Sequence, residues 1–176
     1  EIYEALAAHG YREVGQEYLQ NVLDTAKQLD AYDSGRIYYY LGEYQKAYLA
    51  LDEARDKGGA DSYLYLGRAY AATGDYNYAS SVYNNYLSKQ GPNAEIYNEL
   101  GLCEMAKKEY QNALAAFQAG KQIEGNSLMQ TLCFNEIVAY EYLEDYQQAE
   151  VLMNAYLQNY PDDQTAIREQ QFLSTR

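Results

Sequence analysis

The sequence is poor in the residues that build catalytic and metal centres. Its 176 residues include one histidine and two cysteines. His9 lies beside Gly10 in a predicted turn, so we expect it to be a helix-end residue and not a general base. Without a second histidine or clustered cysteines, no familiar metal-ligand set can form, and no two acids stand as an isolated pair on an apolar background. The sequence therefore indicates a protein that is not an enzyme and has no cofactor.

Cysteine is also too scarce for a disulfide framework. Cys103 and Cys133 fall in the middle of predicted helices, and we expect both to be buried free thiols. The cysteines therefore do not indicate whether the protein resides in a reducing or an oxidising compartment.

Positive charge is scarce as well. The chain has 13 lysines and arginines against 26 aspartates and glutamates, which gives a formal net charge of −13. Because a surface this acidic repels phosphate backbones, we expect no nucleic-acid partner. The sequence also has no apolar run long enough to cross a bilayer, so we expect no direct membrane insertion by this segment.

What the sequence does have is an internal repeat. A tyrosine recurs at steps of 33, 32, 34 and 36 residues. Three residues after each tyrosine comes a small or compact residue, and four residues further on comes a large apolar one. Two helices approach closely only where a side chain is small, and the large residue can fill the space between one hairpin and the next. The three columns are Tyr11, Tyr44, Tyr76, Tyr110 and Tyr146; Val14, Ala47, Ala79, Ala113 and Ala149; and Tyr18, Leu51, Tyr83, Phe117 and Met153.

The clearest copy of the repeat spans residues 60–93. Its first half has the spacing Y-x-x-L-G-x-x-Y from Tyr63, and its second half has A-x-x-x-Y from Ala79, with a break at Gly74 between them. This pattern resembles the tetratricopeptide repeat (TPR), with tyrosine in the places of tryptophan and phenylalanine. The resemblance implies an all-α fold, a right-handed α-solenoid of antiparallel helix hairpins in a TPR array.

The resemblance covers nearly the whole chain, as a single α-solenoid domain over residues 1–176. Three copies depart from the pattern. Ala31 and Ser34 replace an aromatic residue and a leucine in one copy, and Glu104 stands where an aromatic residue is usual in another. In the last copy, Cys133, Glu136 and Ile137 replace the expected residues of a first helix. The boundaries that we predict are a partial N-terminal repeat at 1–27, full repeats at 28–59, 60–93, 94–129 and 130–163, and a C-terminal capping helix at 164–176.

An acid precedes each of four predicted second helices. There it faces the positive end of the helix dipole, an interaction that contributes roughly 0.3–1 kcal/mol. These acids are Glu43, Asp75, Glu109 and Asp145.

The resemblance implies a protein–protein interaction scaffold. Such repeats bind a peptide or a partner segment in a concave groove lined by their first helices. Exposed aromatic residues beside arginine have the composition of an interface hot spot. The groove residues that the resemblance indicates are Tyr32, Arg36, Tyr39, Tyr40, Leu64, Arg68, Asn98, Leu102, Met105, Phe134, Val138 and Tyr142.

Arg36 and Arg68 occupy equivalent positions in consecutive repeats. Two guanidinium groups on one wall of the groove could hold a carboxylate or a phosphate of a partner bidentately. The alternative is that both arginines pair with neighbouring acids of the chain itself. The carboxylate clamp of chaperone-tail binders is not expected, because glutamates would take some of its positions and repel a terminal carboxylate. The neighbouring acids are Asp33, Asp61, Glu95 and Glu99.

Two other functions stay open at this point. The chain could be a structural module that self-associates through its solenoid ends, or the peptide-sensing part of a larger regulator. The start at Glu1 in place of methionine and the low lysine content favour the cell envelope of a bacterium, as for a lipoprotein, with the cytoplasm as the alternative.

Overall fold

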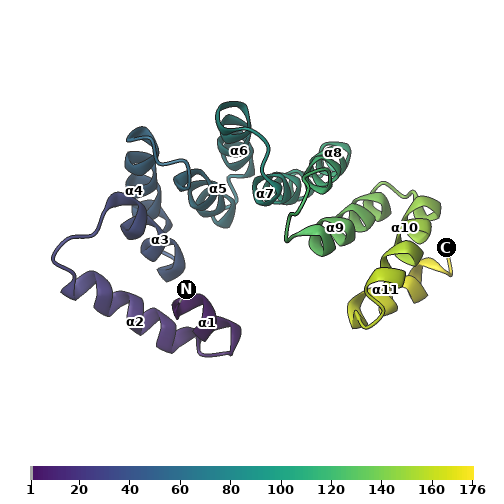
Figure 1. Ribbon diagram of the computed structural model, residues 1–176, viewed down its shortest axis with the longest axis horizontal. Helices are drawn as coiled ribbons and strands as arrows, with labels where there is room; N and C mark the ends of the chain where they lie inside the picture. The colour runs from purple at the N-terminus through teal and green to yellow at the C-terminus, as the bar shows by residue number, and fades with distance from the viewer. Residues whose placement is uncertain (1) are drawn as a thin grey trace. The chain divides into compact units, whose positions relative to one another are not determined.

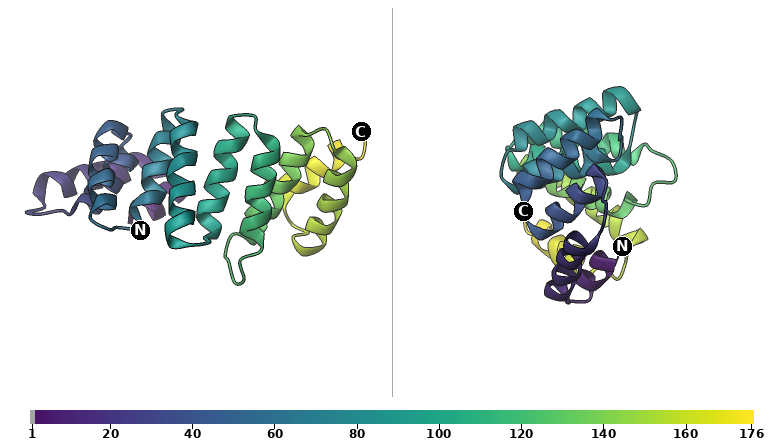
Figure 2. Two further views of the ribbon diagram at one scale, coloured as in Figure 1. Left: turned by 90° about the horizontal axis from the view of Figure 1, so that it is seen from above. Right: turned by 90° about the vertical axis from the view of Figure 1, so that its left-hand side faces the viewer.

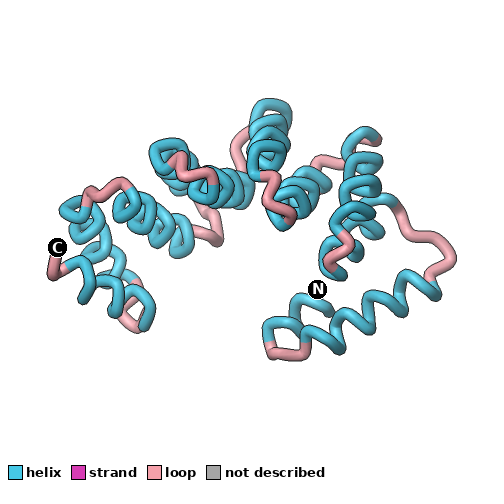
Figure 3. Tube along the Cα trace, turned by 180° about the vertical axis from the view of Figure 1, so that it is seen from behind, coloured by secondary structure: helices cyan, strands magenta, loops and turns pink. Residues whose placement is uncertain are grey.

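The computed structural model describes residues 2–176. Over these residues the chain consists of α-helices joined by loops and turns, without a strand (Figure 3). The all-α fold expected from the repeat is thereby confirmed. In chain order the helices are α1 (Ile2–Ala8), α2 (Arg12–Thr25), α3 (Ala31–Leu41), α4 (Tyr44–Asp56), α5 (Ser62–Ala72), α6 (Tyr76–Gln90), α7 (Ala94–Ala106), α8 (Tyr110–Lys121), α9 (Met129–Tyr142), α10 (Tyr146–Asn159) and α11 (Gln164–Leu173), as labelled in Figure 1.

Two compact units divide the chain. Unit 1 comprises residues 2–82 and unit 2 comprises residues 83–176, so the boundary falls inside α6. Within each unit, a helix runs back along the one before it, and pairs such as α3–α4 and α7–α8 pack closely (Figure 2). Each unit is therefore a stack of helix hairpins, which cover one another's apolar faces. The boundaries between individual repeats stay a prediction.

A tyrosine stands at the start of every second helix. Tyr44, Tyr76, Tyr110 and Tyr146 are the first residues of α4, α6, α8 and α10, and Tyr11 directly precedes α2. The repeat spacing thus locates the start of each second helix to within one residue.

The acids before the second helices act in two ways. The side chains of Asp75 and Asp145 each accept a hydrogen bond of 3.1 Å from the backbone N–H three residues further on. Glu43 and Glu109 make no such capping bond among the described residues. The extra methylene of glutamate carries its carboxylate past the N–H groups, so the glutamates act on the helix end through the dipole and not through a capping bond.

The small residue of the repeat is fully buried in four copies. Ala47, Ala79, Ala113 and Ala149 each have 0% of their surface exposed. They lie on α4, α6, α8 and α10, the second helices of their hairpins. A larger side chain at these positions would push the packed helices apart.

The closest approach of the two helices in a hairpin occurs at a glycine of the first helix. A Cβ on Gly35 would lie 2.5 Å from Cγ of Leu51, and a Cβ on Gly101 would lie 2.3 Å from Cε1 of Phe117. The large residue of the repeat therefore packs on its own hairpin. Phe117 also shares a buried cluster with Leu132 of the next hairpin, as the spacing predicts.

The first hairpin is built in a different register, and here the predicted columns are wrong. Val14 and Tyr18 are 52% and 42% exposed, whereas Gly15 and Leu19 are buried. A Cβ on Gly15 would lie 2.8 Å from Cδ2 of Tyr3. In this hairpin the large residue thus lies on the first helix and the glycine on the second, which turns the buried face of α2 by one residue.

Buried side chains form separate clusters in the two units. In unit 1, Tyr3, Leu19 and Ile37 form one cluster. In unit 2, one cluster includes Phe117 and a second includes Met153. Both units therefore have a core of their own.

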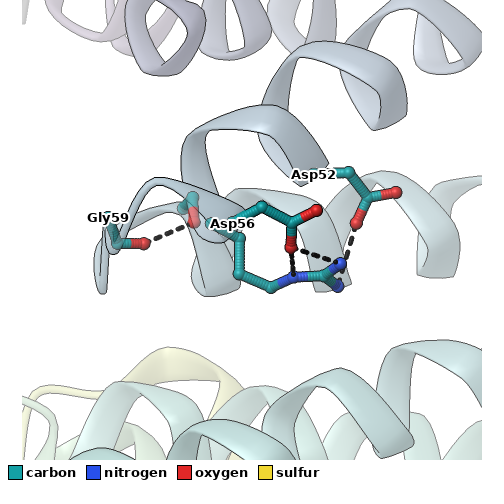
Figure 4. Close-up of polar contacts among 5 residues, drawn as sticks. Asp52, Asp56 and Gly59 are labelled. Atoms are coloured by element: carbon teal, nitrogen blue, oxygen red, sulfur yellow. Dashed lines mark hydrogen bonds and ion pairs between the residues drawn. The ribbon is translucent and has the colours of Figure 1, made fainter.

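The end of α4 is held by polar contacts (Figure 4). Arg55 pairs with Asp52 at 2.9 Å and with Asp56 at 3.2 Å. At the start of α5 the hydroxyl of Ser62, which is fully buried, donates to the carbonyl of Gly59 in the preceding loop. These contacts fix the turn between α4 and α5, and Tyr65 and Arg68 lie on α5.

Candidate functional site

The predicted groove residues all lie on the first helices of hairpins, and we call these surfaces the first-helix faces. Each unit has its own face, formed by α3 and α5 in unit 1 and by α7 and α9 in unit 2. Unit 1 carries Tyr32, Arg36, Tyr39, Tyr40, Leu64 and Arg68, and unit 2 carries Asn98, Leu102, Met105, Phe134, Val138 and Tyr142.

In unit 1 the two arginines meet on one tyrosine ring. The guanidinium carbon of Arg36 lies 4.8 Å from the ring centre of Tyr65, and that of Arg68 lies 5.6 Å from the same centre. Arg36 also lies 5.4 Å from the ring centre of Tyr32. Cation–π contacts of this kind contribute about 0.5–2 kcal/mol, depending on how far they are desolvated. Tyr65, only 6% exposed, is thus the residue that positions both guanidinium groups.

A chain of hydroxyl groups leads from these arginines to an acid. The hydroxyls of Tyr65 and Tyr40 lie 2.9 Å apart, and Tyr40 donates a short hydrogen bond to Oε1 of Glu4 on α1. The Tyr65 hydroxyl lies 3.5 Å from the same oxygen. The hydrogen bond from Tyr40, helped by the charge of Arg36, lowers the pKa of Glu4. Glu4 is therefore ionised at neutral pH.

Glu4 is not among the acids that the sequence pattern suggests for Arg36. It precedes Arg36 by 32 residues, which is one repeat length. The spacing could have revealed it, because Gly15 and Leu19 stand at the same step before Ala47 and Leu51. The tyrosine column of the sequence, shifted by one residue in the first repeat, hides this equivalence.

In unit 2 the first-helix face is built from amides. Nδ2 of Asn135 on α9 donates to Oδ1 of Asn98 on α7, at 2.9 Å. On the same two helices, Leu102 and Tyr142 are 44% and 57% exposed, and Tyr142 stacks on Tyr110 with ring centres 5.0 Å apart. This face therefore presents apolar surface beside polar groups that can both donate and accept.

A cavity of about 300 Å³ lies beside Asn135 in unit 2. Phe134 forms one wall and packs edge-to-face on Tyr156, with ring centres 5.8 Å apart. The hydroxyl of Tyr156 donates to Asp163 at 2.6 Å, and this bond lowers the pKa of the Asp163 carboxyl. The remaining lining residues, Gln130, Thr131 and Thr165, are polar and are not predicted as groove residues.

Several predicted groove residues contact a core as well as the face, among them Phe134 in unit 2 and Tyr40 in unit 1. Met105 packs against the buried cluster of unit 2 that includes Phe117. Val138 is half-buried on α9. They offer less surface to a ligand than Leu102 and Tyr142.

The two glutamates that break the repeat pattern are buried and paired. Glu104, 6% exposed, contacts Lys107 at 2.7 Å. Glu136, 5% exposed, pairs with Lys121 and accepts a hydrogen bond of 2.9 Å from Gln118. Glu136 thus joins α9 to α8, whereas Glu104 pairs with the residue that caps its own helix.

The histidine and the thiols offer little reactivity. His9 places its Nδ1 2.9 Å from the carbonyl of Ala5, at the end of α1, as predicted. Cys103 and Cys133 are free thiols; Cys103 is buried as predicted, whereas Cys133 is half-buried. Burial raises the pKa of Cys103 to about 12 and also raises that of Cys133, so both stay protonated. Within residues 2–176, no cluster of three or more His, Cys, Asp or Glu side chains could hold a metal ion.

None of the described helices combines the length and the apolar character that crossing a bilayer requires.

Comparison with known proteins identifies the repeat. The family model for the tetratricopeptide repeat matches residues 32–77 and 66–126, which together make up more than half of the chain. Among curated proteins, no sequence matches this one.

Three solved structures are similar in fold. TTC0263, a thermophilic TPR protein of Thermus thermophilus, has a TM-score of 0.76 at 16% identity, over 99% of this chain and 96% of that chain. MamA of AMB-1 has a TM-score of 0.66 at 21% identity, over 92% and 81%. The Cut9–Hcn1 hetero-tetramer of the APC/C gives a TM-score of 0.67 at 18% identity, over 97% of this chain and 34% of that chain. At these identities the likeness concerns the fold alone.

Proposed function

Because the chain belongs to the tetratricopeptide repeat family, we propose that it is a non-enzymatic protein–protein interaction scaffold that holds a peptide or a partner segment on its first-helix faces. The fold by itself does not name a partner, since these repeats serve many assemblies. One structural neighbour, Cut9, forms a hetero-tetramer with Hcn1, which supports a protein partner by analogy.

The observation that carries the proposal is the amide pair of unit 2. Asn98 and Asn135 join the first helices of two consecutive hairpins. Asn98 is only 8% exposed and positions Asn135, whose half-buried amide offers the donor and the acceptor that the backbone of a peptide needs. On the same two helices, Leu102 and Tyr142 supply exposed apolar surface for the peptide's side chains. A polar centre with apolar flanks is the usual composition of a peptide site.

The arginines of unit 1 extend the proposal to a second face. Tyr65 holds both Arg36 and Arg68 by ring contacts, so less side-chain entropy is lost when they bind a ligand. A partner that engages unit 1 is expected to bring acidic groups to these guanidinium forks.

A displayed library of random peptides tests the proposal. Peptides that the full chain enriches are measured for affinity by fluorescence anisotropy. Replacing both amides, Asn98→Ala with Asn135→Ala, is expected to weaken peptides that use unit 2 at least tenfold. Arg36→Ala with Arg68→Ala is expected to do the same for peptides that use unit 1.

Two matched controls lie on second helices. Leu49 on α4 and Val151 on α10 are 75% and 58% exposed. Leu49→Ser and Val151→Ser should leave every affinity within twofold. The proposal fails if no peptide is enriched, or if the enriched peptides bind both first-helix double variants as well as they bind the unchanged chain.

Self-association is a second candidate, favoured by one feature of unit 1. Tyr11, Val14 and Tyr18 form an exposed apolar stripe at helical spacing along α2. Light scattering over a hundredfold range of concentration tests this candidate. A constant monomeric mass contradicts self-association. A dimer that dissociates when Tyr18→Ser is introduced supports it.

A further inference from the structure

A carboxylate is already bound on the first-helix face of unit 1, and it belongs to the chain itself. Glu4 accepts the hydrogen bond of Tyr40, lies 3.5 Å from the hydroxyl of Tyr65 and faces the charge of Arg36. We call Arg36, Tyr40 and Tyr65 the carboxylate cradle. Hydroxyl donors backed by a guanidinium group are suited to an ionised acid, because hydrogen bonds to a charged acceptor are about twice as strong as neutral ones.

We propose that the carboxylate cradle is a recognition site for an acidic side chain of a partner segment, and that Glu4 occupies it as an internal competitor. The inference rests on the proposed scaffold function and specifies the chemistry of its ligand. The proposal gives the hydroxyls of Tyr40 and Tyr65 a role. Filling the core does not require them to bind Glu4, because Glu4 is an exposed residue on a short helix.

One donor of the cradle has no acceptor. Tyr40 has a single hydroxyl proton, which goes to Glu4, so Tyr65 donates to Tyr40 in turn. Nε of Arg36 is buried and makes no hydrogen bond with any residue that the structure describes. A buried donor without an acceptor destabilises the folded state. A ligand with a second acceptor could therefore gain a bond that Glu4 does not make.

The competitor is held on a short element. α1 is seven residues long, and so short a helix is marginal on its own. Besides Glu4, its contact with the cradle is the ring of Tyr3 on that of Tyr40, with centres 4.6 Å apart. Next to Glu4 lies an open cavity of about 410 Å³ that is also lined by Arg12 and Gln16. A partner segment thus has space from which to approach.

The net charge of the chain sets a condition on such a partner. At −13 the chain repels an acidic segment at long range, so recognition depends on short-range bonds to the cradle. Salt screens the repulsion over about 8–10 Å. The association rate of an acidic ligand should therefore rise with ionic strength, the reverse of the usual steering effect.

The test uses the full chain and a synthetic copy of its own ligand. The probe is the blocked heptapeptide acetyl-IYEALAA-amide, with acetyl-IYQALAA-amide as its neutral counterpart. Both are titrated by NMR into the 15N-labelled chain and into Glu4→Gln. A tethered competitor acts at an effective concentration of about millimolar. Glu4→Gln should therefore bind the acidic peptide at least tenfold tighter than the unchanged chain does, and at least tenfold tighter than it binds the neutral peptide.

Two further variants separate the cradle from a general charge effect. Glu13→Gln removes one exposed acid of α2 in the same unit and should leave the affinity at that of the unchanged chain. Adding Tyr40→Phe to Glu4→Gln keeps the ring, removes the donor and should abolish the preference for the acidic peptide. Thermal unfolding by circular dichroism verifies that each variant is folded.

The inference is overturned if Glu4→Gln binds both peptides equally, or if it binds the acidic peptide no better than the unchanged chain does. Failure here leaves the scaffold proposal intact as long as library peptides still depend on Asn98 and Asn135. If the library experiment fails and this one succeeds, the scaffold proposal is wrong and the carboxylate cradle stands as a binding site for an acidic segment only.

Discussion

The two units build the same hairpin with different residues at equivalent places. At the turn between paired helices, unit 1 places Gly42 and Gly74 in the left-handed region, with φ of 79° and 84°. Unit 2 places Lys108 and Glu144 there, with φ of 65° and 59°. Left-handed backbone suits glycine and strains a residue with a Cβ. The hairpin therefore does not depend on the ideal turn residue, because packing of the paired helices holds the turn in place.

The first-helix faces of the two units are also built from different residues at equivalent places. Unit 1 joins its groups through tyrosine rings and hydroxyls around Tyr65, whereas unit 2 uses the amides of Asn98 and Asn135. Where the repeat pattern calls for an apolar residue, unit 2 buries Glu136 and neutralises it with Lys121. The fold tolerates each exchange because Glu136 and the two amides each have a hydrogen-bond or ion-pair partner.

The largest expected effect comes from breaking the buried ion pair of unit 2. Lys121→Met leaves the carboxylate of Glu136 buried beside Gln118 alone, and should lower the free energy of unfolding by about 3–5 kcal/mol. Adding Glu136→Leu restores the apolar residue of the pattern and should recover most of the loss. Urea unfolding measures both values.

The matched pair in unit 1 is Lys46 with Glu43, whose side chains are 62% and 37% exposed. Lys46→Met should change the free energy of unfolding by less than about 1 kcal/mol. Equal losses for Lys46→Met and Lys121→Met would contradict the distinction between the units.

The next effect sharpens the likeness of the units. Gly101→Ala places a methyl group against the ring of Phe117, and Gly35→Ala places one against Leu51. Both should lower the melting temperature, corresponding to about 1–3 kcal/mol of overpacking. The loss should be larger for Gly101→Ala, because a flat ring cannot rotate aside as a leucine side chain can. If either substitution is neutral, the helices do not cross as closely as the structure shows.

Exchanging the turn residues between the units should change the free energy of unfolding by a smaller amount. Lys108→Gly and Glu144→Gly remove backbone strain from unit 2 and should each stabilise the chain by about 0.5–1 kcal/mol. Gly42→Lys places the same strain in unit 1 and should destabilise it by a similar amount. Chemical denaturation of the three variants measures the exchange, and a destabilising Lys108→Gly would show that the side chain of Lys108 matters more than its backbone.

The smallest effect is a dependence on pH that has opposite sign in the two units. Burial, and after it the charge of Glu169, raises the pKa of Glu141 in unit 2 to about 7. The folded state thus binds this proton more tightly than the unfolded state, so the contribution to stability is greatest below about pH 4.5 and falls as the pH rises through 7. The pKa of Glu4 in unit 1 is lowered, so its contribution is present at neutral pH and is lost in acid.

Hydrogen exchange at pH 5 and pH 8, compared at corrected intrinsic rates, should show this contrast. The ends of α9 and α11 should exchange faster at pH 8, and Glu141→Gln should remove the difference. An equal pH response in Glu141→Gln and the unchanged chain would assign the effect to other groups.

Much of the fold follows from the sequence because hairpin packing leaves a periodic trace. The alanine column, from Ala47 to Ala149, and the tyrosines that open the second helices recur at a nearly constant step. The packing of the first repeat could not be predicted in this way. There the large residue, Tyr3, lies on the first helix and the small residue, Gly15, lies on the second, the reverse of the other repeats. A column defined by residue type cannot show such an exchange, whereas burial does.

The candidate site could be predicted only in part. The pattern locates Arg36 and Arg68 on first helices, but it does not show that both would stack on Tyr65. Glu4 and Asn135 lie outside the predicted set because their partners are a repeat away in sequence. Contacts of this kind depend on side-chain rotamers across the stack, which no local pattern encodes.

The most direct test of the scaffold is hydrogen exchange of the full chain with and without a saturating library peptide. The account predicts protection on first helices, α3 and α5 or α7 and α9, while α4 and α10 exchange as in the free chain. Protection confined to second helices, or none at saturation, would contradict it.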